Sequence, residues 1–301
     1  MLVVGGGPAG LSAALVLGRA LRTTLVCDAG HPRNARAQGV HGFLTRDGIP
    51  PAELRAAARA ELARYESVTL ENAQVTDIRK DGEHFAFTLA GGTGGRARRV
   101  LLATGVVDTL PALPGLEALY GTSVFHCPFC DGWEVRGGAL AVYGGGEHAV
   151  GLALELKAWS ADIVLLGTVD PADRERLGAA GITVREDEVR RLENEGGKLA
   201  RVVFADGSSL ARDALFFCTG HRQGSDLAER LGCPLDEKGS VATLDATRTC
   251  VPGIFVAGDA SKESHMVVVA AAEGALAAIA IHTELTEEDN SRTIRRAPSP
   301  R

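Results

Sequence analysis

Residues 2–28 read LVVGGGPAGLSAALVLGRALRTTLVCD, and this stretch decides the fold. A short apolar strand leads into a glycine turn, an apolar-periodic helix follows, and a second strand, Thr24–Cys27, ends at Asp28. The turn has the spacing G-x-G-x-x-G. In such a turn the first glycine permits the tight bend, the second lets backbone approach a pyrophosphate, and the third lets the helix pack close to the sheet.

Asp28 supplies the acidic residue that completes this motif. It lies 23 residues after Gly5, where a carboxylate accepts hydrogen bonds from ribose hydroxyls. The N-terminus of the helix that follows the turn stabilises the negative charge of phosphates. We therefore predict a dinucleotide site made by Gly5, Gly7, Gly10 and Asp28; an ordinary tight turn between strand and helix is the alternative.

The same pattern returns at residues 139–167, which read ALAVYGGGEHAVGLALELKAWSADIVLLG. A turn of the form G-x-G-x-x-A follows the strand Leu140–Tyr143, and Ile163–Leu166 is the next strand. No acidic residue or basic cluster comes directly after that strand. The second unit is therefore either a nicotinamide nucleotide site or a scaffold that has lost its nucleotide. The candidate nucleotide-binding residues are Gly144, Gly146, Glu147, His148 and Ala149.

Two such units predict an α/β protein with two Rossmann-like three-layer dinucleotide-binding domains. Linkers rich in proline and glycine fall at about 110–115 and 238–240. We expect one domain at 1–110 plus 240–290, a second domain inserted at 111–239, and a flexible tail at 291–301.

The composition excludes several classes of protein. The 301 residues are 45% hydrophobic and 23% charged, with a net charge of −6, which excludes a disordered chain and argues against nucleic acid or anionic membrane as a partner. The most apolar stretch, 266–281, is interrupted by Glu273 and is shorter than the ~20 residues of a membrane-spanning helix. We expect a buried helix there, and a cytoplasmic protein.

The chemistry is expected at two of the six cysteines, Cys127 and Cys130, in the stretch FHCPFCDGWE at 125–134. A C-x-x-C pair at a helix start forms a disulfide, and the helix N-terminus lowers the pKa of one of its thiols. A zinc site would need two more ligands at short spacing, and no second such pair follows, so we predict no metal. Asp131 is an acid within reach of a leaving thiolate; a carboxylate that only stabilises the helix start is the alternative.

The order of the motifs GGGPAG, ATG, CxxCDG, a second GGGxxA and PGIFVAGD resembles that of the low-molecular-weight thioredoxin reductases and their relatives over roughly residues 1–285. The resemblance implies an FAD domain, an inserted pyridine-nucleotide domain that carries the cysteine pair, and a homodimer. It implies that Cys130 faces the flavin, Cys127 exchanges with the substrate, and Asp131 donates a proton. The implied FAD-binding residues are Gly5, Gly7, Pro8, Gly10, Asp28, Asn34, Val75, Ala103, Thr104, Gly105, Gly258, Asp259, Met266 and Val267.

The sequence departs from the reductases at the second unit. There the reductases carry a His-Arg-Arg cluster that reads the 2′-phosphate of NADPH, whereas this chain has Gly167–Val169, with Arg174 and Arg176 as approximate substitutes. The segments at 31–34, 40–44 and 133–135 resemble a neighbouring branch of dithiol oxidases, which close disulfides in small natural products and pass electrons to oxygen. Those oxidases carry histidine where this chain has Asp131.

Three functions follow from these patterns. In a reductase, NADPH or NADH would reduce FAD, then the cysteine pair, then a disulfide in a thioredoxin-like protein or a small molecule; Asp131 favours this direction. In a dithiol oxidase, electrons would pass from a substrate dithiol through the same groups to oxygen; the missing basic cluster favours that direction. A flavin-binding redox sensor without turnover is the third possibility.

Overall fold

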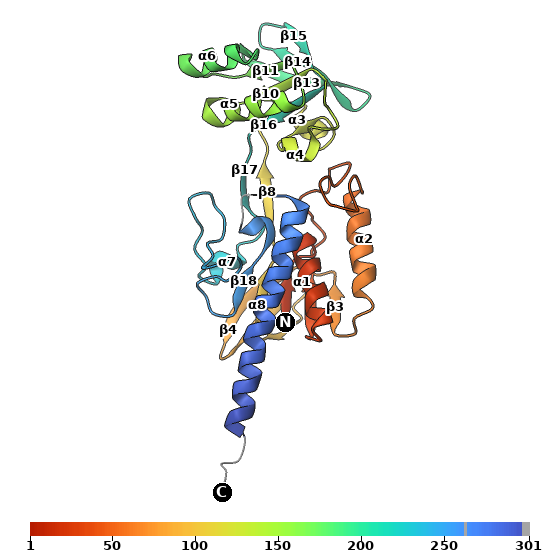
Figure 1. Ribbon diagram of the computed structural model, residues 1–301, viewed down its shortest axis with the longest axis vertical. Helices are drawn as coiled ribbons and strands as arrows, with labels where there is room; N and C mark the ends of the chain where they lie inside the picture. Colours follow the sequence, from red (N-terminus) through yellow and green to blue (C-terminus); the bar gives the residue numbers. More distant parts are fainter. Residues whose placement is uncertain (262–263, 297–301) are drawn as a thin grey trace. The chain divides into compact units, whose positions relative to one another are not determined.

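The computed structural model describes residues 1–261 and 264–296, with only the backbone described at 294–296 (Figure 1). Within this part the chain forms two compact units. One contains residues 1–33, 52–107 and the segment from 222 onward, and the other contains 34–51 and 108–221. Each unit is built on its own parallel sheet, as the two glycine turns of the sequence predict.

The first unit has a five-stranded sheet in the order β18-β7-β1-β2-β3, with every neighbouring pair parallel. The strands β1, β7 and β18 are fully buried and apolar because both faces of the sheet are covered there. The strands are β1 (Leu2–Val4), β2 (Thr24–Cys27), β3 (Val68–Glu71), β7 (Val100–Leu102) and β18 (Ile254–Val256). Alternate side chains of β1 therefore enter different cores, Val3 on one face and Leu2 and Val4 on the other.

Helices cover one face of this sheet and a small antiparallel sheet covers the other. On the helical face α1 (Pro8–Arg19) packs along α8 (Val267–Arg296) around Leu17, Ala277 and Ile281 (Figure 1). On the opposite face lie β4 (Val75–Asp81), β5 (His84–Leu89) and β6 (Gly94–Ala97), which bring Phe85 and Phe87 into the core. The helix α2 (Pro51–Leu62) precedes β3. The unit thus has three layers.

The second unit repeats this plan strand for strand. Its parallel sheet has the order β12-β11-β10-β16-β9. The strands are β9 (Val124–Phe125), β10 (Leu140–Tyr143), β11 (Ile163–Leu166), β12 (Thr183–Arg185) and β16 (Ala214–Phe217). The helices are α5 (Gly146–Glu155), the short 3-10 turn η1 (Leu156–Ala158) and α6 (Pro171–Ala179), and the antiparallel sheet is β13 (Val189–Glu195), β14 (Lys198–Phe204) and β15 (Ser209–Ala211). The predicted fold class is confirmed.

The chain passes between the units in β8 (Val106–Thr109) and β17 (Gly220–Gln223), which form a two-stranded sheet. The short helices are α3 (Leu116–Leu119), α4 (Pro128–Asp131), α7 (Leu227–Arg230) and the 3-10 turn η2 (Gly258–Ala260). The unit boundaries differ from the predicted domain boundaries at two places. Residues 222–239 fall in the first unit, because Leu227, Ala228 and Cys233 pack in the same core as Leu2 and Val4. Residues 34–51 fall in the second unit.

The predicted flexible tail at 291–301 needs correction, because α8 continues to Arg296; residues 297–301 lie outside the described part. Ion pairs with residues far away in the sequence hold α8 within this stretch, where Arg292 pairs with Glu83 at 2.6 Å, and directly before it. Arg22 binds Asp289 at 2.8 Å, and Arg98 binds Asp289 at 2.7 Å and Glu288 at 2.6 Å. Local sequence carries no trace of such partners, so the polar composition alone predicted a frayed end.

Helix α8 is also longer than the predicted buried helix. Over Val267–Thr293 it is long and apolar enough to cross a membrane by length and composition alone. Its residues Ala277, Ala278, Ile281 and Leu285 are buried in the core with α1. This packing accounts for the apolar residues on one face of the helix, whereas Val268, Leu276 and Ile279 are exposed.

Candidate functional site

The first glycine turn has the geometry of a dinucleotide turn. Gly5 has a φ of +114°, and a Cβ atom there would lie 2.1 Å from the carbonyl oxygen of Ala103 at the end of β7. A Cβ at Gly10 would lie 1.9 Å from the carbonyl oxygen of Gly5, so the helix packs against the turn. A Cβ at Gly7 would meet nothing within 4 Å. The first and third glycines are required by packing, and the second leaves space for a ligand.

The space beside Gly7 lies at the N-terminus of α1. Gly7 is the N-cap, no side chain caps the helix, and its first turn holds no acidic residue. Backbone N–H groups at such a terminus attract an anion, and the helix dipole adds to the attraction. Pro8, the first residue of the helix, needs no hydrogen-bond acceptor for its nitrogen. The predicted pyrophosphate site is thus open and electropositive.

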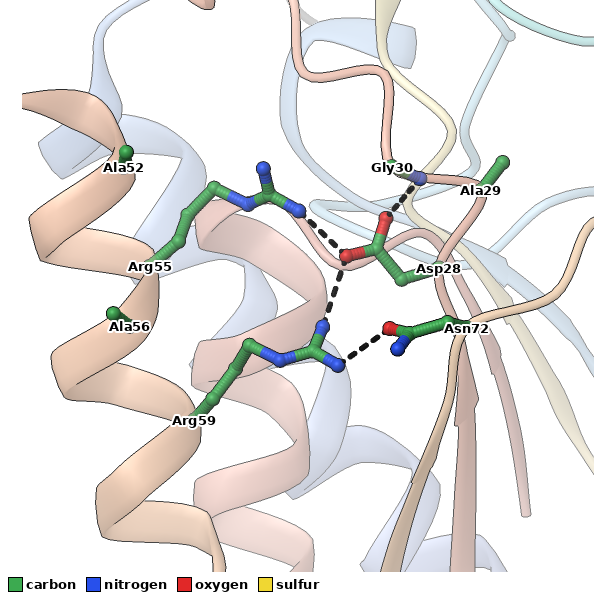
Figure 2. A pocket seen from close by; sticks show the side chains of 8 residues that line it. All are labelled: Asp28, Ala29, Gly30, Ala52, Arg55, Ala56, Arg59 and Asn72. Atoms are coloured by element: carbon green, nitrogen blue, oxygen red, sulfur yellow. Dashed lines mark hydrogen bonds and ion pairs between the residues drawn. The ribbon is translucent and has the colours of Figure 1, made fainter.

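Asp28 lies in a pocket at the end of β2, and Figure 2 shows arginine side chains of α2 reaching towards it. Its Oδ1 accepts a hydrogen bond from the Gly30 N–H at 2.9 Å, and its Oδ2 accepts from Arg55 at 2.7 Å and from Arg59 at 3.1 Å. Arg59 also donates to Asn72 at 2.6 Å. The pocket has a volume of about 410 Å³, and Ala29, Ala52 and Ala56 complete its lining.

These contacts keep Asp28 ionised. Burial raises the pKa of its carboxyl group, but the hydrogen bond from Gly30 and the charges of Arg55 and Arg59 outweigh burial and hold the pKa below its ordinary value. A Cβ at Gly6 would lie 2.3 Å from Asp28 Oδ2, so the pocket adjoins the glycine turn. An ionised carboxylate beside the turn is suited to accept hydrogen bonds from ribose hydroxyls.

Sequence reasoning found Asp28 but missed three residues of its pocket. Arg55 and Arg59 are four residues apart and therefore share one face of α2. Asn72 directly follows β3, the parallel neighbour of β2, and so lies at the same edge of the sheet as Asp28. The spacing of the two arginines and the position of Asn72 after a strand can both be read from the sequence. Neither feature shows which carboxylate the arginines bind.

Other predicted FAD-binding residues lie at the ends of β7, the neighbour of β1, and of β18, the next strand in the sheet. Ala103, Thr104 and Gly105 follow β7. Gly258 has a φ of +78°, and a Cβ there would lie 3.0 Å from the Cβ of Ala9, so the turn after β18 approaches the first turn of α1. The carboxyl ends of strands on either side of a point where strand order reverses form the usual crevice for a dinucleotide.

The remaining predicted FAD-binding residues have different surroundings. Asp259 forms an ion pair with Arg33 at 3.0 Å. Val75 is buried in the core with Leu2 and Val4, so its side chain serves packing. Met266 and Val267 lie at the start of α8. Asn34 belongs to the second compact unit and not to the unit that holds the first glycine turn.

Taken together, the first unit fits an FAD molecule. It offers open backbone donors for a pyrophosphate at Gly7, an ionised carboxylate for a ribose at Asp28, and a 410 Å³ pocket beside that carboxylate. Backbone fills the space where a Cβ would lie at Gly5 and Gly10, and the Cβ of Ala9 lies close to it at Gly258, so a larger residue is disfavoured at all three positions.

The second glycine turn keeps the same backbone shape. Gly144 has a φ of +139°, and its carbonyl oxygen would lie 2.0 Å from a Cβ at Gly167. The Cβ of Ala149 lies 3.7 Å from a Cβ built at Gly144, so alanine fits at the third position of the turn. A Cβ at Gly146 would meet nothing within 4 Å. The turn therefore leaves space for a nucleotide at the N-terminus of α5.

The charges around this turn are poorly suited to a 2′-phosphate. Glu147 places an acidic side chain in the first turn of α5. The two arginines considered as substitutes for the basic cluster are each held by a carboxylate. Arg174 pairs with Glu186, and Arg176 lies 3.9 Å from Asp173. Their positive charges are thus offset locally.

Cys127 and Cys130 form a disulfide with a Cα–Cα distance of 5.3 Å. Cys127 is the N-cap of α4, and its carbonyl oxygen accepts hydrogen bonds from the N–H groups of Cys130 and Asp131, both at 3.2 Å. Pro128 occupies the first helical position, where its fixed φ suits the helix. A Cβ at Gly132 would lie 2.6 Å from the Pro128 carbonyl oxygen, so the glycine of the CDG motif allows this tight turn.

Asp131 is the titratable group next to this disulfide. Burial, and after it the negative charge of Glu134, raise the pKa of its carboxyl to about 7, against an opposing effect of His41. His41 Nε2 lies 3.5 Å from Glu134 Oε1, and its Nδ1 lies 3.7 Å from Asp47 Oδ1. A carboxyl group with a pKa near neutrality can both give and take a proton, and such shifts are common at functional sites. Among the residues described, no cluster of three or more histidine, cysteine or acidic side chains could hold a metal ion.

Comparison with known proteins gives a consistent result. Residues 1–275 match the family described as pyridine nucleotide-disulphide oxidoreductase. The chain is 32% identical to thioredoxin reductase aclD of Aspergillus oryzae, covering 97% of this chain and 98% of that protein. Among solved structures it is similar to HlmI, with a TM-score of 0.93, 37% identity and coverage of 98% and 94%. It is also similar to an oxidoreductase from Agrobacterium tumefaciens, with a TM-score of 0.89, 35% identity and coverage of 95% and 97%.

Proposed function

Because the chain belongs to the pyridine nucleotide-disulphide oxidoreductase family and is an FAD-dependent disulfide oxidoreductase of the thioredoxin reductase kind, we propose that Cys127 and Cys130 carry its thiol–disulfide exchange. The observation that carries this proposal is the Cys127–Cys130 disulfide followed directly by Asp131, whose pKa is about 7. A redox-active pair beside an acid poised near neutrality can exchange disulfides and protonate a leaving thiolate.

In the reductase direction the pair begins as two thiols. The Cys127 thiolate attacks one sulfur of the substrate disulfide, the substrate S–S bond breaks, and the other substrate sulfur leaves as a thiolate. Asp131 gives its proton to that thiolate and takes one back from the Cys130 thiol. The Cys130 thiolate then attacks Cys127 Sγ, which releases the second substrate sulfur as a thiolate and restores the Cys127–Cys130 disulfide. That thiolate takes up from solvent a proton equivalent to the one that the Cys127 thiol lost on ionising. Two electrons pass from the cysteine pair to the substrate. Bound FAD supplies the two-electron exchange with the pair and with the second redox partner.

The first unit would hold that FAD. We propose that the N-terminus of α1 at Gly7 binds the pyrophosphate, that Asp28 accepts hydrogen bonds from the adenosine ribose, and that Arg55 and Arg59 keep Asp28 ionised and in place. The open space at Gly7 and the three hydrogen bonds to Asp28 support these roles.

Exchanging Gly7 for alanine is expected to weaken FAD binding at least about tenfold, because the added methyl group occupies the space that a pyrophosphate needs. The fold should remain intact, since a Cβ at Gly7 meets no protein atom within 4 Å. The measurement is the FAD content of the purified protein and its affinity for added FAD. The matched control is Gly178→Ala in α6, which is equally unobstructed. Equal FAD content in both variants would show that Gly7 does not face the cofactor.

The direction of electron flow is the open part of the function. A dithiol oxidase is the second candidate, and the observation that favours it is the local pairing of Arg174 and Arg176 with carboxylates near the second turn. Because Arg174 and Arg176 are both paired with carboxylates, we expect them to give NADPH little advantage over NADH through its 2′-phosphate.

Anaerobic mixing decides between the two directions. We expect flavin absorbance near 450 nm to bleach with nicotinamide nucleotide. NADPH should act no more than about tenfold better than NADH, because carboxylates already occupy Arg174 and Arg176. Bleaching by a dithiol but by neither nucleotide, followed by peroxide formation when air is admitted, would establish the oxidase. A flavin that no donor bleaches would leave only a redox sensor.

The partners follow from the same chemistry. We propose a disulfide in a thioredoxin-like protein or small molecule as the substrate, and a homodimer as the working assembly, which light scattering would test. We also propose a reducing compartment such as the cytoplasm. The four other cysteines, all within the described residues, are free thiols, which supports this location: Cys27, Cys218, Cys233 and Cys250.

A further inference from the structure

Two exposed aromatic side chains lie next to the Cys127–Cys130 disulfide. Phe129 stands between the two cysteines in the chain, and 63% of its surface is exposed. Trp133 follows four residues later and is 64% exposed. In the described part of the chain these are the two exposed aromatic residues, whereas the other exposed large hydrophobic residues are aliphatic. An apolar surface that stays in water beside a reactive group indicates a binding surface.

The backbone places both aromatic residues on the same side of α4. Gly132, which follows the helix, keeps helical angles, with a φ of −65° and a ψ of −33°. Its N–H group donates to the carbonyl oxygen of Pro128 at 2.8 Å. The helical winding therefore continues from Phe129 to Trp133, and side chains four residues apart lie on one face of a helix.

Neighbouring side chains hold each ring in place. Trp159 meets the ring of Phe129 at an angle of 88°, with 5.8 Å between the centroids. The guanidinium group of Arg136 lies 3.9 Å from the centroid of the Trp133 ring and donates to the Trp133 carbonyl oxygen at 2.6 Å. Both rings are thus supported from the protein, while the greater part of each remains exposed.

The extent of this surface favours a small molecule as its ligand. A phenylalanine or tryptophan side chain has roughly 150–250 Å² of surface, so two rings that are nearly two-thirds exposed offer roughly 200–300 Å². A protein–protein interface of standard size covers about 800 Å² on each partner. The two rings therefore fall well short of a protein docking surface, but they match the faces of one or two rings of a small molecule.

The position of Phe129 limits how far such a ring lies from the reacting sulfur. A substrate sulfur that is bonded to Cys127 stands two residues before Phe129 in the chain, and two residues span at most ~7 Å. A ring attached to that sulfur through one carbon can reach Phe129 without a long linker. Aromatic rings pair best edge to face or in offset stacks, and both arrangements need an open ring such as these.

We propose that Phe129 and Trp133 bind the substrate, and that the substrate is a small-molecule disulfide, or the corresponding dithiol, with an aromatic or other flat ring close to its sulfur. This inference rests on the proposed exchange at Cys127 and Cys130 and adds the class of substrate. In the reductase direction the Cys127 thiolate bonds to the ring-bearing sulfur, and the other substrate sulfur leaves as a thiolate. Cys130 then displaces the ring-bearing sulfur. Two electrons pass from the cysteine pair to the substrate, and Phe129 and Trp133 transfer neither electrons nor protons.

The first test compares benzyl 2-hydroxyethyl disulfide with ethyl 2-hydroxyethyl disulfide, which lacks the ring. The FAD-loaded protein is reduced with dithiothreitol, freed of reductant under anaerobic conditions and mixed with either disulfide. Maleimide trapping and peptide mass spectrometry follow the return of the Cys127–Cys130 disulfide. We expect the benzyl compound to reach half of its maximal rate at a concentration at least about tenfold lower, because its ring is taken out of water against two aromatic side chains.

The variants assign this preference to the two rings. Phe129→Leu and Trp133→Leu should each reduce the ratio between the two half-saturating concentrations about three- to tenfold, the effect of one aromatic contact, and should change the maximal rates less than about twofold. Phe129→Tyr keeps a ring and should keep the ratio. Leu244→Ala removes an exposed side chain of the other compact unit and is the matched control.

Binding also has a readout that needs no exchange. The chain has two tryptophans, Trp133 and Trp159, and both belong to this surface. Benzyl 2-hydroxyethyl sulfide, which has no S–S bond, should therefore change the tryptophan fluorescence of the FAD-loaded protein, and ethyl 2-hydroxyethyl sulfide should change it far less. Phe129→Leu should weaken binding of the benzyl compound about three- to tenfold.

The outcomes separate this inference from the proposed function. Equal half-saturating concentrations for the two disulfides, or a ratio that neither Phe129→Leu nor Trp133→Leu changes, would overturn the inference while the exchange itself stands. A larger loss with oxidised thioredoxin than with the benzyl disulfide in these variants would make the surface a protein docking surface and the inference wrong. Failure of the proposed function differs, because neither disulfide would then oxidise the cysteine pair although the benzyl sulfide still binds. If Trp133→Leu does not fold, Phe129→Leu and Phe129→Tyr decide the matter.

Discussion

Replacing Cys130 with serine is expected to lower steady-state disulfide exchange by more than about a thousandfold, because an essential covalent participant is removed. Without Cys130 the mixed disulfide between Cys127 and the substrate has no neighbouring thiol to resolve it. Serine fills nearly the same volume, so the short helix α4 and the separate FAD-binding unit should keep their structures. The variant should therefore remain yellow while losing turnover.

The two cysteine variants should differ in the covalent adduct that they accumulate, and this difference separates the proposed roles of the cysteines. Cys130→Ser should accumulate a covalent adduct at Cys127, visible by intact-protein mass spectrometry after incubation with a disulfide substrate. Cys127→Ser should lose turnover equally but accumulate no adduct. Cys250→Ser is the matched control, because Cys250 is an exposed free thiol, and its turnover should equal that of the unsubstituted protein. Adducts in the reverse pattern would exchange the roles of Cys127 and Cys130.

The parts of the fold that the sequence predicted well are those decided by local patterns. The strands Thr24–Cys27, Leu140–Tyr143 and Ile163–Leu166 were predicted to the residue, since each is a short, mainly apolar run that ends at a polar or glycine residue. The roles of Gly5 and Gly10 also followed from spacing, because a G-x-G-x-x-G turn has one backbone geometry.

The parts that sequence could not predict depend on residues far apart in the chain. The end of α8 is held by Arg22, Arg98 and Arg99, about 190 to 270 residues away. The electrostatic environment of Asp131 depends on His41, which lies far before it in the sequence. The arginines of α2 were visible as a helical pair, but their carboxylate partner was not. Each of these pairings is made by the fold.

Substituting Asp131 with asparagine is expected to slow the exchange step about a hundredfold, a typical effect of losing a general acid. The pKa of Asp131 is about 7, raised by burial and by Glu134. In the unsubstituted protein the carboxyl holds its proton below pH 7 and can donate it, so the rate of the acid-dependent step should fall as the pH rises above 7. An amide has no such proton, so this fall in rate, the alkaline limb of the pH–rate profile, should be absent in Asp131→Asn. Stopped-flow measurement of substrate thiol release from pH 5.5 to 9 reports the limb directly.

Two neighbouring substitutions should move that limb in opposite directions. Glu134→Gln removes a negative charge that raises the pKa of Asp131, so the limb should move to lower pH; His41→Gln removes an opposing charge, so the limb should move to higher pH. Movement in the same direction for both, or a limb that survives in Asp131→Asn, would assign the proton to another group.

Stability offers a readout of Asp131 that is independent of turnover. A carboxyl group with a pKa of about 7 in the folded protein and 3.8 when unfolded binds more protons in the native state between those values. The free energy of unfolding therefore falls as the pH rises from about 4 to 7, and Asp131→Asn should lose this dependence. Denaturant unfolding measures the free energy of unfolding of both proteins at each pH. The value for the variant minus that for the unsubstituted protein should be larger at pH 8 than at pH 4. A flat difference between the two proteins across this range would show that burial does not shift Asp131, and the proton donor would then have to be sought elsewhere.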